Sequence, residues 1–122
     1  MKIDYNNFYT LWGAALESTN REQYISEWST SDIFYPAPEQ PNPDMLEGAN
    51  ALGNIWDTAH MKLSDFRRQT GLTQVDFAKF LCVPRRTLEN GESRGTCHSY
   101  YRLMIAKQMH ILKVDVECPK IS

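Results

Sequence analysis

The chain has 122 residues, of which 42% are hydrophobic and 23% charged, and its formal net charge at pH 7 is −2. This size and balance favour one compact domain, or a small domain with an appended segment. No apolar run approaches the roughly 20 residues that span a membrane, and the polar start excludes a secretory signal peptide. We therefore expect a cytoplasmic protein.

The charges are distributed unequally along the chain. Residues 1–59 contain two basic and nine acidic residues, a net charge of −7, whereas residues 60–122 contain eleven basic and six acidic residues, a net charge of +5. This division predicts a basic working half and an acidic second half, with chance scatter of surface charge as the alternative.

The three cysteines, Cys82, Cys97 and Cys118, are odd in number and lack Cys-x-x-Cys spacing, which argues against a disulfide framework or a zinc ribbon. Cys97 and His98 are adjacent, but no second pair stands at ligand spacing, so we interpret them as loop residues. No serine, histidine and acid set has a supporting context. We therefore expect no metal, no cofactor and no catalytic site.

The first predicted helices lie in the acidic half. Residues 5–17 place apolar side chains at helical spacing: Phe8, Leu11, Trp12, Ala15 and Leu16. A second helix is expected over residues 20–28, with Asn20 as its N-cap. The face expected to be buried carries Tyr24, Ile25 and Trp28.

Four prolines interrupt residues 29–44, which we interpret as an extended connection whose Ile33, Phe34 and Tyr35 contact a core. A third helix is expected from Pro43 to His60. Gly48 and Gly53 weaken that prediction by up to roughly 1 kcal/mol each relative to alanine, and suggest close approach by a neighbouring helix.

The basic half begins with a predicted helix over residues 61–71, with Leu63 and Phe66 inward and Gly71 as a left-handed stop. Thr73 then caps a helix whose apolar face is Phe77, Ala78 and Leu81. A turn at Cys82 and Val83 leads to a third short helix that opens with Pro84 and turns Leu88 inward. Two such helices must cross steeply, which is the helix-turn-helix arrangement.

The C-terminal part is expected to contain a helix over residues 99–109, with Tyr100, Leu103 and Met104 facing inward. After it, Val114 and Val116 alternate with charged residues, which indicates a short strand or, alternatively, a frayed tail.

Residues about 60–112 resemble the Cro/phage-repressor (XRE-like) family of helix-turn-helix domains. The positions that carry the resemblance are Leu72, Thr73, Gln74, Ala78, Val83, Thr87 and Leu88. The match covers a little under half of the chain. It implies a small helical bundle that binds double-stranded DNA, usually as a homodimer on a two-fold operator.

Two residues depart from the family pattern. Cys82 stands where glycine is usual, at a turn position that often requires positive φ, which costs on the order of 1 kcal/mol. Gly91 stands where a tryptophan is common. We expect Gly91 to end the recognition helix early, and Tyr100 and Tyr101 to refill the space of the missing indole.

The resemblance also implies roles for individual residues. Thr73, Gln74 and the amides at the start of their helix would hold a phosphate. Arg85 and Arg86, on the first turn after Pro84, would read guanine, and Glu89 and Asn90 would read cytosine and adenine. The full set of candidate DNA-binding residues is Thr73, Gln74, Lys79, Pro84, Arg85, Arg86, Thr87, Glu89, Asn90 and Arg94.

We therefore predict an all-α protein. It comprises an acidic, aromatic-rich helical extension for packing or dimerisation (1–59), a helix-turn-helix bundle (60–113) and a tail or short strand (114–122). The predicted function is a sequence-specific, repressor-like transcriptional regulator that acts as a homodimer. The alternative is a protein-binding module, such as a phage or mobile-element inhibitor or an antitoxin-like protein, whose partner contacts the N-terminal extension.

Overall fold

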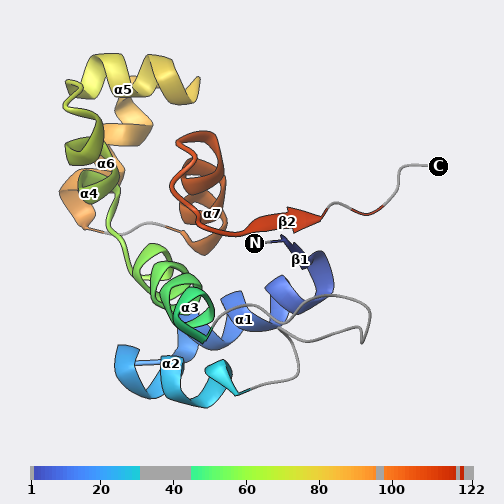
Figure 1. The fold of residues 1–122 in the computed structure, drawn as a ribbon. Helices are drawn as coiled ribbons and strands as arrows, with labels where there is room; N and C mark the ends of the chain where they lie inside the picture. The colour runs from blue at the N-terminus through green and yellow to red at the C-terminus, as the bar shows by residue number, and fades with distance from the viewer. Residues whose placement is uncertain (1, 31–44, 96–97, 118, 120–122) are drawn as a thin grey trace. The chain divides into compact units, whose positions relative to one another are not determined.

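A computed structural model of the protein describes residues 2–30, 45–95, 98–117 and 119 (Figure 1). Seven helices dominate the described residues, so the prediction of an all-α fold is confirmed. The chain divides into two compact units: Met1–Ala59 with Leu112–Ser122, and His60–Ile111. The expected proline-rich connection, with Ile33, Phe34, Tyr35 and Pro43, lies outside the described residues.

The first helix of the first unit is α1, Tyr5–Glu17. The Asp4 carboxylate accepts a hydrogen bond from the Asn6 amide at 3.2 Å and caps the helix start. Its buried face consists of Phe8, Leu11, Trp12 and Ala15, as the three- and four-residue spacing predicts.

Helix α2, Arg21–Ser29, begins at the predicted cap, because Asn20 Oδ1 accepts from the Gln23 amide at 3.0 Å. The ring of Tyr24 is buried, and its hydroxyl donates to the carbonyl oxygen of Leu11 at 2.8 Å. Burial disfavours the phenolate and so raises the pKa of Tyr24 well above its usual value.

Helix α3, Met45–Ala59, packs against α1 and α2. The close approach expected at Gly53 is observed: a Cβ there would collide with the guanidinium of Arg21. That guanidinium lies over the glycine and pairs with Asp57, Nε to Oδ1, at 2.9 Å. The missing side chain of Gly53 therefore lets an ion pair join α2 to α3.

The C-terminal segment forms a short strand and not a frayed tail. Strand β2, Asp115–Glu117, pairs in parallel with β1, Lys2–Asp4, and Ile3 lies opposite Val116. Ile3 and Val114 are both buried. This pairing places residues 112–117 in the same unit as the N-terminal helices.

The second unit contains α4 (Leu63–Thr70), α5 (Gln74–Leu81), α6 (Arg85–Arg94) and α7 (Ser99–Gln108). Gly71, at φ 71°, ends α4 as predicted. The core is formed by apolar side chains from all four helices: Phe66, Phe77, Ala78, Leu88, Ile105 and Ala106.

The predicted inward face of α7 was wrong. Tyr100 and Met104 are 64% and 48% exposed, whereas Ile105 and Ala106 are buried. The true stripe includes Arg102, whose Nε donates to the carbonyl oxygen of Met61 at 2.8 Å. A basic residue on the inward face concealed the apolar stripe in the sequence.

The prediction that Gly91 ends the third short helix early was also wrong. Helix α6 continues through Gly91 to Arg94. The left-handed residue that stops it is Gly95, at φ 66°. Gly91 therefore lies in a helix interior and has a helical backbone conformation. It differs from its neighbours only in having no side chain.

Candidate nucleic-acid interface

Helices α5 and α6 form a pair joined by the turn Cys82–Pro84. Thr73 Oγ1 accepts from the Asp76 amide at 3.2 Å, so Thr73 is the N-cap of α5 as predicted. Cys82 adopts φ 59°, the left-handed conformation expected at this position. The Val83 amide then donates to the carbonyl oxygen of Ala78 at 3.0 Å, which closes the turn.

The inner faces of α5 and α6 meet at small and apolar side chains. Ala78 is 3% exposed and Leu88 is 1% exposed. The small Ala78 side chain suits the contact between two helices that cross steeply. Leu88 fixes the inward side of α6, and this determines which residues of α6 face solvent.

A carboxylate at the end of α6 ties three helices together. Glu92 Oε1 receives Arg67 Nε of α4 at 2.5 Å, and Glu92 Oε2 accepts from Gln74 Nε2 of α5. Arg67 Nη1 also donates to the carbonyl oxygen of Leu72 at 3.3 Å. The side chain of Glu92 is only 7% exposed. These bonds hold α6 at a defined position against α4 and α5.

This network changes the expected role of one residue. Gln74 lies at the start of α5, where we expected a phosphate contact, but its Nε2 donates to Glu92. Neither Glu92 nor its pairing with Arg67 was predicted from the sequence. An acid on the same side of α6 as Leu88 is the signal that could have revealed it, because a buried acid requires a partner.

The outer face of α6 is polar and basic. At 100° per residue, the positions opposite the buried Leu88 are Arg86, Asn90 and Ser93, and all three are exposed. Arg86 forms no ion pair with any described residue. Ser93 was not among the sequence-based candidates, although its position three residues after Asn90 and five after Leu88 places it on this face.

The remaining candidates lie to either side of that face. Arg85 is 60% exposed and pairs with Glu89, Nε to Oε1, at 2.8 Å on one flank. Pro84 is the N-cap of α6 and not a first-turn residue, and Lys79 is exposed on α5. Thr87 and Arg94, on the other flank of α6, line a pocket against α7, and Asn90, at the edge of the outer face, lines it as well.

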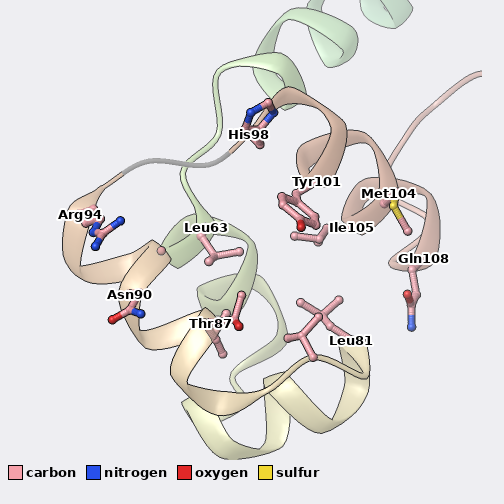
Figure 2. Close-up of a pocket in the computed structure, with 13 residues that line it drawn as sticks. Leu63, Leu81, Thr87, Asn90, Arg94, His98, Tyr101, Met104, Ile105 and Gln108 are labelled. Carbon is pink, nitrogen blue, oxygen red and sulfur yellow. The ribbon is translucent and has the colours of Figure 1, made fainter.

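This pocket lies between α6 and α7 and has a volume of about 390 Å³ (Figure 2). Gly91 lines it, at the position where the resembled family commonly carries tryptophan. Tyr100 and Tyr101 remain 64% and 53% exposed, although Tyr101 reaches the pocket wall. The expectation that they refill the space was wrong, because the side of α7 that carries them is not the buried side.

Comparisons of the chain with protein-family models, with curated proteins and with solved structures find no match. In residues 2–30, 45–95, 98–117 and 119, no helix is long and apolar enough to cross a membrane. Within the same ranges, no three His, Cys, Asp or Glu side chains gather as they would around a metal ion. Cys97 lies outside the described residues.

Proposed function

We propose that residues 60–111 form a helix-turn-helix domain that binds double-stranded DNA and acts in the cytoplasm as a sequence-specific transcriptional regulator. The observation that supports this best is the outer face of α6. There, Arg86, Asn90 and Ser93 are exposed on a helix that Leu88 and Glu92 fix from the inside. The major groove of DNA admits one such helix.

The charge of the second unit favours this proposal. Residues 60–111 contain nine basic and four acidic residues, a net charge of +5, whereas residues 1–59 with 112–122 contain four basic and eleven acidic residues, a net charge of −7. Phosphate neutralisation supplies most of the sequence-independent affinity of DNA-binding proteins. Lys79 and the amides at the start of α5, next to Thr73, are the phosphate contacts that we propose.

Base reading would fall to the outer face of α6. Arg86 can donate two hydrogen bonds to a guanine, and Asn90 can pair with an adenine. Arg85 can take the same role as Arg86 when it leaves Glu89, and Glu89 can accept from cytosine. A single module of this size contacts few bases, so we propose a homodimer that reads two half-sites related by two-fold symmetry.

The test is selection of binding sites from a random duplex library with the full chain, followed by affinity measurements on the enriched sequence. Arg86→Ala should weaken that binding by about 1–3 kcal/mol, roughly five- to 150-fold, while affinity for random DNA falls far less. Reversing both charges, Arg85→Glu with Arg86→Glu, should abolish specific binding. Lys107→Glu, an exposed charge reversal on α7, is the control.

Salt dependence provides the second readout. The wild-type affinity should fall steeply between 50 and 200 mM salt, because bound phosphates release counterions. Failure to enrich any sequence, together with unchanged affinity of the double charge reversal, contradicts the proposal.

The acidic first unit favours a second candidate, a protein-binding module that keeps this fold as a scaffold. A net charge of −7 on that unit complements a basic protein partner. This candidate predicts weak, sequence-blind retention on DNA. It also predicts partner binding that survives both arginine reversals on α6.

A further inference from the structure

The pocket between α6 and α7 has two chemically different ends (Figure 2). At one end lie Arg94, from the last turn of α6, and His98, at the start of α7. At the other end lie Leu81, beside the α5–α6 turn, and Ile105 of α7. The pocket thus has the Arg94 guanidinium at one end and mainly aliphatic side chains, beside Gln108, at the other.

Its volume, about 390 Å³, falls within the range of roughly 300–1,000 Å³ found for small-molecule sites. Protein interiors otherwise leave few voids larger than a water molecule. The lining also has the usual composition of such sites, since most of it is apolar and a few polar groups converge on it. The polar members are Thr87, Asn90, Arg94, His98 and Gln108.

Gly91 contributes no side chain to the pocket that it lines. Gly91 lies inside α6 and lines the pocket, so we expect a large side chain at this position to occupy part of it. Glycine in a helix interior is less favourable than alanine by up to about 1 kcal/mol. Gly91 therefore keeps the pocket wall free of a side chain although glycine makes α6 less stable there.

The charges of the residues that line the pocket favour a negatively charged ligand. Among the described residues that line the pocket, Arg94 carries a positive charge and none is acidic. Three other arginines of this unit, Arg67, Arg68 and Arg85, already pair with carboxylates. Arg94 is exposed and forms no ion pair with any residue in the described part of the chain. A guanidinium at the rim of an apolar pocket suits a carboxylate or sulfonate.

We propose that this pocket binds an amphipathic organic anion. The aromatic or branched apolar body of the ligand lies between Leu81 and Ile105, and its acidic group pairs with Arg94. Tyr101, at the pocket wall, offers a ring face or edge to an aromatic body. This binding does not depend on the proposed DNA-binding function.

The experiment uses two fluorescent probes and the full chain. 8-Anilinonaphthalene-1-sulfonate carries an aromatic body and an anionic group, whereas N-phenyl-1-naphthylamine has the same rings without the sulfonate. The sulfonate probe should bind with one-to-one stoichiometry, and the uncharged probe should bind about tenfold more weakly, which is the effect of one charge-assisted hydrogen-bonded pair.

Variants locate the probe. Arg94→Gln should weaken binding of the sulfonate probe about tenfold and leave the uncharged probe unchanged. Arg68→Gln, which removes an equal charge at an exposed position outside the pocket, should change neither. Gly91→Trp should abolish binding of both probes, whereas Gly91→Ala should retain it and raise thermal stability. Thr87→Phe fills the pocket from its exposed rim, and it should also abolish binding if Gly91→Trp does not fold.

Three results would overturn the proposal. Equal affinity for the two probes contradicts the preference for an anion, as does an Arg94→Gln variant that binds both probes like wild type. If Gly91→Trp or Thr87→Phe folds and still binds the probes, the probes bind at another site. Several probes bound per chain, rather than one, would show general adhesion to apolar surface.

Discussion

The guanidinium of Arg67 in α4 contacts the carboxylate of Glu92 in α6 at 2.5 Å, and the Glu92 side chain is almost fully enclosed. Truncating one partner of a buried ion pair leaves the other charge without compensation. Arg67 keeps 28% of its side-chain surface in solvent, which moderates that penalty. Glu92→Ala should therefore lower the free energy of unfolding by about 2–3 kcal/mol.

Urea unfolding of the full chain, followed by far-UV circular dichroism, measures this effect. Glu89→Ala is the matched control, because it removes an acid from the same helix at an exposed pair with Arg85. It should change stability by no more than about 1 kcal/mol. Equal effects of the two substitutions would show that the Arg67–Glu92 pair contributes no more than a surface pair.

Cys82 occupies a left-handed backbone conformation, φ 59°, that a Cβ disfavours. Cys82→Gly should raise the free energy of unfolding by about 0.5–1 kcal/mol, because relief of the steric strain exceeds the extra entropy of an unfolded glycine. Cys82→Ala removes the thiol but keeps the Cβ, so it should give no gain. A stabilised alanine variant would mean that the thiol, and not the backbone, is responsible.

The burial of Tyr24 predicts that the first unit becomes less stable at alkaline pH. Burial raises its pKa above the ordinary value of about 10, so the folded state keeps its proton where the unfolded state loses it. The stabilising effect of the neutral ring is therefore complete below pH 10 and declines as the pH rises above it. Tyr24→Phe should remove this decline, and it should cost about 0.5–1.5 kcal/mol near neutral pH for the lost bond to Leu11.

Tryptophan fluorescence during urea unfolding at several pH values checks this prediction. Trp12, Trp28 and Trp56 all belong to the same unit as Tyr24, so their emission reports the unfolding of that unit. Tyr9→Phe, at an 80% exposed position, is the control and should keep the alkaline decline. A wild-type stability that stays constant between pH 9 and 12 would contradict the prediction.

Local signals in the sequence were sufficient for much of the fold. The caps at Asn20 and Thr73 and the stop at Gly71 each depend on residues within one helical turn. The face of α7 was not predictable in this way, because Arg102 is placed inward by a hydrogen bond to Met61, 41 residues away. The pairing of β1 with β2 likewise joins the two ends of the chain, and no local pattern encodes a parallel pair.

The candidate site was predicted to a similar extent. The turn at Cys82 and the inward position of Leu88 follow from spacing and from the expected need for positive φ. The role of Gln74 did not follow, because its partner Glu92 belongs to another helix and is reached only in three dimensions. The pocket at Gly91 also depends on how α7 packs, and the sequence did not reveal that packing.

Glu89 provides a test that depends on the proposed DNA contact. Its carboxylate pairs with Arg85 at 2.8 Å, and both side chains are exposed on one flank of α6. Glu89→Gln removes a negative charge that would face the phosphates and releases Arg85 to contact them. Affinity for random duplex DNA should therefore rise about two- to fivefold, because a surface charge interaction of this kind is worth roughly 0.5–1 kcal/mol.

The same substitution should have a different effect on the selected sequence. If Glu89 accepts a hydrogen bond from a cytosine, Glu89→Gln weakens binding to the selected sequence while it strengthens binding to random DNA. The ratio of specific to random affinity then falls by more than either affinity changes. Fluorescence anisotropy on both duplexes at two salt concentrations measures this ratio. The double variant Arg85→Gln with Glu89→Gln is the control and should lose the gain on random DNA. A Glu89→Gln variant that binds random DNA more weakly than wild type would mean that this flank of α6 does not face the phosphates.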